Sequence, residues 1–318
     1  MSKILITTDY LRPGDEVDQL LRDNGHETIH RPHRTTRSRE QLDEIFSGVE
    51  GALIASEPVD ATTIANASAL RVVARSGVGY DSVDVEAATR RGVLVCNAPG
   101  SNSVAVAEMT FAALLLCCRR LLASVDGVRA GGWPRHDGDE LRGAALGIVG
   151  FGPAGRQVAT LARAFGMTTL VHTRWRDAGF DGVEYVGLDE LLARSDYVSL
   201  HCKLDPSTRG LVDRDRLAAM KPTAYLVNTA RGGLVDEAAL AEAVRTGVIA
   251  GAVLDVLVDE PLGADHPFRT VPDITVLSHL AGQTVQARRE ASMSAAESIL
   301  QALGGLIPKT CVNAPGTR

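Results

Sequence analysis

Three side chains have types that could bind a carboxylate and move a proton at a carbonyl group while a separate donor supplies a hydride. Arg231, Glu260 and His279 each follow a β-branched run that is typical of a buried strand. Reduction of a 2-keto acid needs a cation to hold the carboxylate and polarise the carbonyl, and an acid to protonate the alkoxide. Because parallel strands bring their carboxyl ends to one edge of a sheet, we expect these side chains to converge.

Each of the three residues also has a structural interpretation when it is taken alone. Arg231 could cap a helix, Glu260 could be a solvated loop acid, and His279 could be a hydrogen-bonded histidine at a strand end. The catalytic interpretation is favoured because all three occur together, downstream of a nucleotide-binding pattern.

This nucleotide-binding pattern is a glycine loop between a buried strand and an amphipathic helix. Residues 146–155 read LGIVGFGPAG, which contains G-x-G-x-x-G at Gly150, Gly152 and Gly155. These glycines allow a tight turn, close approach to a pyrophosphate and close helix packing, respectively. The phosphates would lie at the helix N-terminus. The flanking strands and helix make the interpretation specific, whereas the glycines at 77–79 lack a third glycine and a helix.

The end of the next strand indicates which dinucleotide the chain binds. NAD-binding folds carry an acid about 20 residues past the glycines. Here Thr173 takes that position, and Arg174 and Arg176 would attract a 2′-phosphate. The alternative is that both arginines are surface residues and Asp177 binds the ribose. We expect NADP(H) in preference to NAD(H).

The elements that must position these residues alternate between strand and helix patterns, which predicts parallel sheets with helices on both faces. A turn-rich segment at 97–102, the expected hinge, separates two series of strands. A long helix over 103–130 follows it, and a final helix over 285–303 is expected to return to the first domain. The predicted strands are 3–8, 27–31, 52–55, 72–74, 93–96, 146–149, 169–172, 197–200, 224–228, 252–255 and 274–277, and two early helices are 16–24 and 39–46.

Composition and charge limit the partners. The formal net charge is -6 and no basic stripe occurs, so no nucleic acid is expected. One basic cluster, interpreted as a solvated loop in preference to a phosphate site, consists of Arg31, His33, Arg34, Arg37 and Arg39. Five scattered cysteines predict reduced thiols, a cytoplasmic location and no metal site. The apolar stretch 104–118 is shorter than the about 20 residues of a membrane span, so no membrane partner is expected.

With these features the chain resembles the D-isomer-specific 2-hydroxyacid dehydrogenase family over nearly its whole length. The resemblance rests on ARSGVGYD at 74–81, NAPG at 97–100, VAE at 106–108, the glycine loop and the stretches around the three candidate catalytic residues. It implies two doubly wound parallel-sheet α/β domains. A Rossmann cofactor domain, residues 100–284, would be inserted into a flavodoxin-like substrate domain, residues 1–99 and 285–318.

The resemblance implies a role for each matching residue. His279 would be the general acid/base, Glu260 would hydrogen-bond it and favour its imidazolium form, and Arg231 would bind the substrate carboxylate and carbonyl. Backbone N–H groups of Val78 and Gly79 would hold the carboxylate. The expected cofactor contacts, among which Asp255 would orient the nicotinamide amide, are Val106, Gly150, Gly152, Pro153, Ala154, Gly155, Thr173, Arg174, His201, Cys202, Thr229, Ala230, Arg231, Asp255, His279 and Gly282.

The chain departs from the family pattern at four positions. Pro153 stands where arginine is frequent, Lys203 and Ser278 stand where proline is common, and Leu257 replaces a frequent aromatic residue. None of these changes removes a catalytic group, but they alter the expected cofactor contacts and pocket. Because the chain stops at Arg318, we expect no regulatory extension of the kind that some phosphoglycerate dehydrogenases carry.

The implied function is hydride transfer between NAD(P)H and a small 2-keto or 2-hydroxy acid, with the D-isomer as product of reduction. Glyoxylate/hydroxypyruvate reduction ranks first, because such relatives often use NADPH, and D-3-phosphoglycerate oxidation ranks second. An alternative from another class is a dinucleotide-sensing protein like certain corepressors. The Leu- and Ala-rich helix beginning near Ser103 predicts a homodimer, with an intrachain core helix as the alternative.

Overall fold

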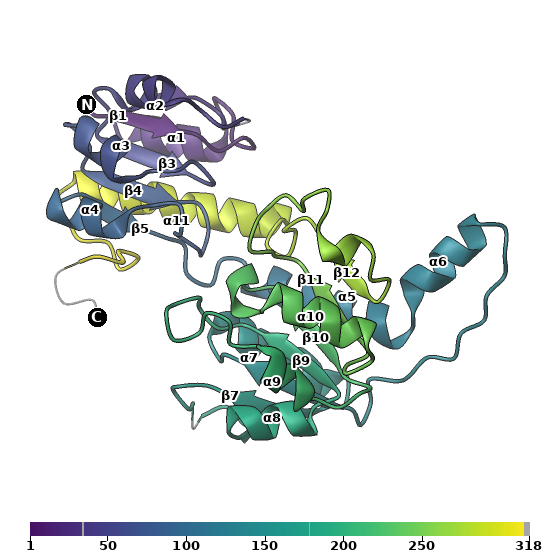
Figure 1. Ribbon diagram of the computed structural model, residues 1–318. Helices are drawn as coiled ribbons and strands as arrows, with labels where there is room; N and C mark the ends of the chain where they lie inside the picture. The colour runs from purple at the N-terminus through teal and green to yellow at the C-terminus, as the bar shows by residue number, and fades with distance from the viewer. Residues whose placement is uncertain (34, 178, 315–318) are drawn as a thin grey trace. The chain divides into compact units, whose positions relative to one another are not determined.

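The computed structural model describes residues 1–33, 35–177 and 179–314 (Figure 1). The chain divides into two compact units, which we call unit 1, Met1–Asn102 with Thr284–Arg318, and unit 2, Ser103–Gln283. The predicted domain limits, after residues 99 and 284, lie within three residues of these divisions.

Unit 1 contains a parallel five-stranded sheet in the order β2-β1-β3-β4-β5. This is the flavodoxin-like order of a doubly wound sheet, as predicted. The strands are β1 (Lys3–Ile6), β2 (Glu27–His30), β3 (Gly51–Ile54), β4 (Val72–Arg75) and β5 (Leu94–Cys96). The helices are α1 (Glu16–Asp23), α2 (Arg39–Phe46), α3 (Ala61–Asn66), α4 (Val85–Arg90) and α11 (Val285–Leu303).

The helices of unit 1 begin at polar caps and bury one face on the sheet. Asp15 and Asp60 cap α1 and α3, and Ser38 forms a capping box with Gln41 at α2, which satisfies free N–H groups of each first turn. Helix α11 packs against β3 and β4, where Ala295 and Ile299 join one buried core. The prediction that the final helix returns to the first series of strands is confirmed.

Unit 2 contains a parallel seven-stranded sheet in the order β12-β11-β10-β9-β6-β7-β8. Its strands are near-continuous apolar runs because helices cover both faces. The order reverses beside β6, and open α/β sheets bind ligands at the carboxyl ends of strands at such a point. The strands are β6 (Ala145–Val149), β7 (Thr168–His172), β8 (Glu184–Tyr185), β9 (Tyr197–Leu200), β10 (Tyr225–Asn228), β11 (Gly251–Leu254) and β12 (Ile274–Val276).

One helix of unit 2 differs from the prediction. The helix expected over 103–130 is two helices, and the chain turns at Arg120, whose φ is 49°. The carbonyl of Cys118 accepts a hydrogen bond from the N–H of Asp139, so it is satisfied by a distant segment. No glycine or proline marks the turn in the sequence. The helices and 3₁₀ turns are α5 (Ser103–Cys118), α6 (Leu121–Arg129), α7 (Pro153–Ala164), α8 (Leu188–Arg194), α9 (Arg214–Ala218), η1 (Gly232–Leu234), α10 (Glu237–Arg245) and η2 (Pro267–Arg269).

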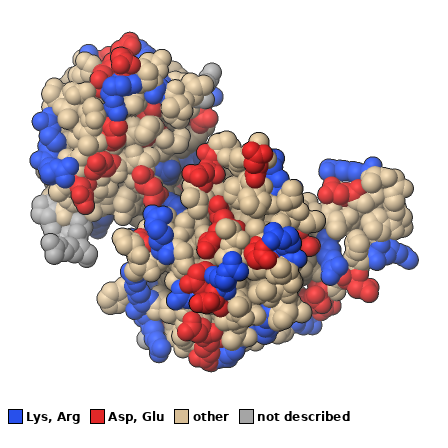
Figure 2. All heavy atoms as spheres, in the orientation of Figure 1, with Lys and Arg blue, Asp and Glu red and all other residues tan. Residues whose placement is uncertain are grey.

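Charges are interspersed on the visible face of each unit (Figure 2). In the basic cluster of unit 1, Arg37 and His33 both contact the carboxylate of buried Glu57, and Arg39 pairs with Asp60. Because the Arg37 side chain is only 14% exposed, the expectation of a solvated loop is wrong for this residue. Arg34 lies outside the described residues. Within the described part of the chain, no helix could span a membrane and no group of side chains could hold a metal ion.

Candidate active site

Arg231 lies directly after β10, at the carboxyl edge of the unit 2 sheet. Buried Asn228 fixes this segment, since its side-chain Nδ2 donates to the carbonyl of Arg231 at 2.8 Å and its Oδ1 accepts from the N–H of Ala230 at 3.0 Å. The Arg231 guanidinium donates to the carbonyl of Ala230 at 2.7 Å. A Cβ on Gly232 would stand 1.9 Å from the carbonyl carbon of Leu257, so only glycine lets the turn after β11 pass here.

Glu260 and His279 are paired. Nδ1 of His279 lies 2.8 Å from Oε2 of Glu260, and the other carboxylate oxygen accepts from the N–H of Leu257 at 3.0 Å. The pair is partly open, with the His279 side chain 51% exposed. Because Glu260 accepts the Nδ1 proton, Nε2 is the ring nitrogen left to exchange a proton with a ligand.

Asp255 holds the turn that carries His279. His279 has a φ of 57°, a left-handed conformation that costs a non-glycine residue about 1 kcal/mol or more. The two carboxylate oxygens of Asp255 accept from the N–H groups of Leu280 at 2.7 Å and Ala281 at 2.8 Å, which offsets this cost. Burial raises the pKa of Asp255, while these hydrogen bonds act in the opposite direction.

The glycine loop lies between β6 and α7 and fits a dinucleotide. Gly150 has a φ of 99°, and a Cβ there would meet the backbone of His201 and Cys202. A Cβ on Gly155 would stand 2.3 Å from the carbonyl oxygen of Gly150, whereas the space beside Gly152 is open. Helix α7 begins at Pro153 without a side-chain cap at Gly152, which leaves its first N–H groups for a phosphate.

His201 and Cys202 follow β9 and lie against the glycine loop. Nε2 of His201 is 2.8 Å from Oγ of buried Ser199, and burial lowers the pKa of His201 to about 4. The ring is therefore neutral near pH 7. Burial also raises the pKa of Cys202 to about 11, so its thiol is protonated and unreactive.

The predicted 2′-phosphate residues follow β7. Arg174 contacts the side chains of Ser207 and Asp205, with 3.3 Å between Nη2 and the Asp205 carboxylate. Arg176 lies 5.8 Å from the Tyr185 ring centroid. Asp177, the alternative ribose acid, lies 3.0 Å from Nη1 of Arg156. Both the arginines and the acid thus have protein partners that a bound nucleotide would have to share or displace.

The remaining predicted residues lie in three places. Thr229 and Ala230 precede Arg231, and Thr229 approaches Thr110 of α5, one turn after the buried Val106. Pro153 and Ala154 start α7, and Gly282 follows the turn held by Asp255. Val78 and Gly79 belong to unit 1, where Nδ2 of Asn97 donates to the carbonyl of Val78 at 2.6 Å.

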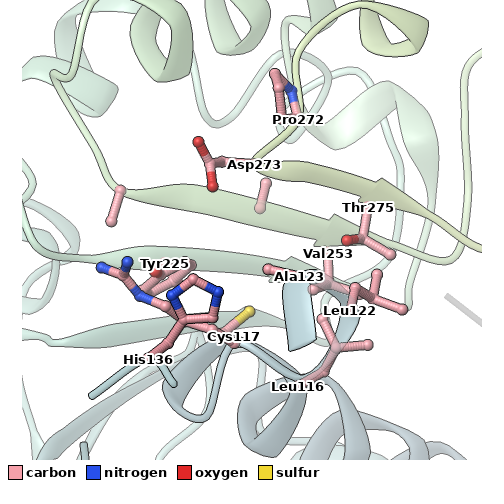
Figure 3. Close-up of a pocket in the computed structure, with 13 residues that line it drawn as sticks. Leu116, Cys117, Leu122, Ala123, His136, Tyr225, Val253, Pro272, Asp273 and Thr275 are labelled. Carbon is pink, nitrogen blue, oxygen red and sulfur yellow. The ribbon is translucent and has the colours of Figure 1, made fainter. Parts of the chain in front are cut away.

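A cavity of about 400 Å³ lies at the opposite edge of the unit 2 sheet (Figure 3). It is bounded by Leu116 and Cys117 of α5 and by the amino-terminal ends of β10 and β11, at Tyr225 and Ala252. His136 also lines it. Since the predicted catalytic residues lie at the carboxyl ends of the same strands, this cavity is separate from them.

Sequence reasoning missed Asn228 and assigned Asp255 a cofactor contact without its hydrogen bonds to the backbone. Asn228 and Asp255 are both nearly fully buried and both hydrogen-bond the backbone of the catalytic segments. Asp255 was expected only to contact the nicotinamide. A polar residue that ends an otherwise apolar strand is the signal for Asn228, because a buried amide needs hydrogen-bond partners.

The parallel sheet, the uncapped glycine loop and the strand-end residues define a nicotinamide-dinucleotide-dependent oxidoreductase. A profile described as "D-isomer specific 2-hydroxyacid dehydrogenase, NAD binding domain" matches residues 111–281. The chain belongs to the D-isomer specific 2-hydroxyacid dehydrogenase family, whose members act on CH–OH groups.

Individual relatives agree with this membership. The chain is 40% identical over 270 residues to a glyoxylate reductase of Aeropyrum pernix, covering 81% of each chain. It is 43% identical over 263 residues to a D-3-phosphoglycerate dehydrogenase of Mycobacterium leprae, covering 81% of this chain and 50% of that protein. The chain therefore spans about half the length of this relative. A crystal structure of a Thermus thermophilus protein superposes with a TM-score of 0.88 at 37% identity, covering 98% of this chain and 99% of the other.

Proposed function

We propose that this chain reduces glyoxylate and hydroxypyruvate to D-2-hydroxy acids with NADPH. The observation that carries the proposal is the 2.8 Å contact between Nδ1 of His279 and Oε2 of Glu260. This contact supplies an oriented proton donor at the same edge of the sheet as the strand-end arginine, which suits carbonyl reduction. The relationship to the Aeropyrum glyoxylate reductase supports the choice of substrate.

The residues act as follows under this proposal. Arg231 binds the substrate carboxylate and polarises the carbonyl. His279, whose Nδ1 is held by Glu260, gives its Nε2 proton to the carbonyl oxygen. Glu260 stabilises the imidazolium before that transfer. The nicotinamide, when bound, supplies the hydride. Its pyrophosphate would be held by the glycine loop and its ribose 2′-phosphate by Thr173, Arg174 and Arg176.

Preference for the phosphorylated dinucleotide rests on the strand-end residues. Thr173 is neutral where an acid would repel a 2′-phosphate, and the Arg174 side chain is 62% exposed. Its contacts with Asp205 and Ser207 lie on the surface, where ion pairs are weak and easily exchanged for a stronger anion. The pairing of Asp177 with Arg156 also makes that acid less suited to a ribose.

Oxidation of D-3-phosphoglycerate is the second candidate. The guanidinium of Arg75 lies against the backbone of Gly77, since a Cβ on Gly77 would stand 1.8 Å from Nη1 of Arg75. A cation next to the predicted carboxylate-binding loop would suit a substrate with a phosphate tail. The identity to the Mycobacterium leprae enzyme also favours this candidate.

Initial rates test the proposal. Reduction of glyoxylate, hydroxypyruvate and pyruvate is measured with NADPH and with NADH. Oxidation of D-3-phosphoglycerate is measured with NADP⁺ and with NAD⁺. We expect NADPH turnover with glyoxylate or hydroxypyruvate that exceeds turnover with NADH. Turnover with NADH alone would overturn the proposed preference for NADPH. Oxidation of D-3-phosphoglycerate as the only activity would overturn the proposed substrates. Inactivity throughout would favour a dinucleotide-sensing protein.

We also propose that two copies of the chain form a homodimer through α6 and that the protein is cytoplasmic. Helix α5 is largely buried within unit 2, so the exposed apolar surface belongs to α6 instead. No side chain of α6 is buried, and Leu121, Leu122, Val125 and Val128 are each 41–46% exposed. A lone helix of nine residues is marginal in water, so a second copy packed on α6 would stabilise it. The five free cysteines fit a reducing compartment.

A further inference from the structure

Glu237, the first residue of α10, binds the turn that carries Glu260. Its Oε1 accepts from the N–H of Val258 at 2.8 Å, and its Oε2 lies 3.3 Å from Nε2 of His266. The Glu237 side chain is only 17% exposed. Both carboxylate oxygens are therefore directed away from the helix and toward the segment that follows β11.

The hydrogen bonds of His266 establish its tautomer. Nδ1 of His266 accepts from the N–H of Phe268 at 3.3 Å. The proton of the neutral ring must then be on Nε2, which donates it to Glu237. His266 thus links the far end of the loop, at η2, to the same carboxylate that holds Val258.

Two consecutive peptide N–H groups in this turn are bound by different carboxylates. The N–H of Leu257 donates to Glu260, and the N–H of Val258 donates to Glu237. The backbone of Gly232, next to Arg231, packs directly against the peptide unit that joins Leu257 and Val258. A shift of this turn would therefore move Glu260 relative to His279 and disturb the segment that carries Arg231.

We propose that Glu237, together with His266, is a positioning residue for the proton-transfer pair. It fixes the 257–260 turn so that one oxygen of Glu260 remains on the Leu257 N–H while the other meets His279. This inference rests on the proposed role of His279 as proton donor. Glu237 itself touches no reacting atom in this scheme.

A structural explanation alone would treat Glu237 as an acid in the first turn of a helix, where it stabilises the dipole. The neighbouring Asp236 provides the comparison, because it caps α10 by accepting from the N–H of Ala239 at 2.9 Å. Asp236 therefore serves the helix, whereas both oxygens of Glu237 serve the loop. Loss of either carboxylate weakens α10, but only loss of Glu237 releases the turn.

The test compares wild type, Glu237→Ala, Glu237→Gln and Asp236→Ala. For each protein, kcat and KM for glyoxylate are measured against pH, together with thermal stability and amide hydrogen exchange of residues 256–262. In Glu237→Ala we expect kcat to fall about tenfold or more, since small misplacements of catalytic groups have effects of this size. The alkaline limb of keto-acid reduction should move to lower pH, because a displaced Glu260 stabilises the imidazolium less.

The two other variants and the exchange data make the outcome decisive. Glu237→Gln keeps an oxygen for the Val258 N–H and should recover most of kcat, whereas Asp236→Ala should lose stability while kcat and the pH limb stay at wild-type values. Exchange at 256–262 should accelerate in Glu237→Ala only. Equal kcat, pH limb and exchange in Glu237→Ala and Asp236→Ala would overturn the inference. Absence of wild-type turnover would contradict the proposed function instead. Even in that case, unchanged exchange in Glu237→Ala would show that Glu237 does not fix the 257–260 turn.

Discussion

At the scale of single residues, the arrangement around His279 is defined by hydrogen bonds rather than by burial. Its ring is half exposed, yet Glu260 holds Nδ1 and Asp255 holds the next two peptide N–H groups. The ring can therefore meet a ligand from solvent while its orientation stays constant. In the proposed role of proton donor, a ring held in this way would act without reorganisation during the reaction.

Removal of the proposed proton donor, His279, should abolish most of the activity without unfolding the protein. In His279→Gln we expect kcat for keto-acid reduction to fall by about 10²–10⁴-fold, the usual contribution of a general acid. Arg231→Ala should raise KM and lower kcat, because it loses both the carboxylate contact and the polarising charge. Steady-state kinetics at saturating NADPH check both results, and wild-type rates in both variants would refute the mechanism.

His201 should make folding stability depend on pH. Its pKa is lowered from 6.5 to about 4 by burial, so between these values the unfolded chain binds a proton that the folded chain does not. The stabilising effect of the neutral ring is present above pH 6.5 and is lost as pH falls toward 4. Linkage gives a loss of about 2–3 kcal/mol between pH 7 and 4.5.

Urea unfolding at pH 7, 5.5 and 4.5 measures this dependence, with His201→Asn as the matched variant. The difference in unfolding free energy between the two proteins should change across this range, because asparagine does not titrate. A constant difference at all three pH values would show that His201 is not the responsible group.

At the scale of elements, the carboxyl ends of five neighbouring strands gather the candidate residues. Strands β7, β6, β9, β10 and β11 are adjacent in the sheet, so Thr173, the glycine loop, His201, Thr229 and Asp255 follow strands that lie side by side. The close contact of Gly150 with the end of β9 joins two of these segments directly. The position of the site thus depends on the order of strands in the sheet. Pairing between strands that are distant in the sequence establishes this order.

Two glycine substitutions should separate folding from nucleotide binding. In Gly150→Ala the new Cβ would meet the N atom of Cys202 at 2.5 Å, and φ is 99°, so we expect stability to fall by about 1–3 kcal/mol. In Gly152→Ala no atom of the described residues outside the immediate chain neighbours lies within 4 Å of the new Cβ, so stability should remain near wild type.

Dinucleotide affinity distinguishes these variants further. Gly152→Ala should bind NADPH more weakly, because the methyl group would occupy the space where the backbone meets the pyrophosphate. Fluorescence titration with NADPH and thermal unfolding are the measurements. Wild-type affinity in Gly152→Ala would place the phosphates elsewhere, and full stability in Gly150→Ala would contradict the local packing.

At the scale of the whole molecule, the proposed homodimer depends on the exposed apolar surface of α6. The segment between Cys118 and Asp139 is closed at its base by a backbone hydrogen bond, and it carries exposed apolar side chains, including Trp133 at 81% exposure. Contiguous exposed apolar surface is a feature of protein–protein contacts, among other interaction sites, and it supports the proposed dimer. The cavity in Figure 3 is lined by Leu122 and Ala123, near the start of the same segment.

Disruption of the apolar face of α6 should therefore change the oligomeric state. We expect wild type to sediment as a dimer and Val125→Asp to sediment as a monomer at micromolar concentration, because a charge would be buried without a partner. Arg129→Ala, on the same helix, serves as the control and should remain dimeric. Sedimentation velocity checks this, and a monomeric wild type would refute the proposed dimer.

Much of the fold follows from local patterns in the chain. Apolar runs bounded by turn residues located nearly all strands to within one or two positions, since buried parallel strands need continuous apolar sequence. The helices 39–46 and 285–303 were predicted with their observed limits. The glycine spacing and the family resemblance together indicated the dinucleotide loop and the candidate catalytic residues, because each depends on residue type at a particular place in the sequence.

Tertiary structure alone decided the features that depend on distant segments. The turn at Arg120 has no local signal and accompanies a bond from Asp139 to Cys118. The two-residue strand β8 exists only because β7 pairs with it. The burial of Arg37 on Glu57, the hold of Asp255 on the His279 turn and the contacts of Glu237 with Val258 and His266 all join residues far apart in the chain. Such contacts depend on three-dimensional proximity, which local sequence patterns do not encode.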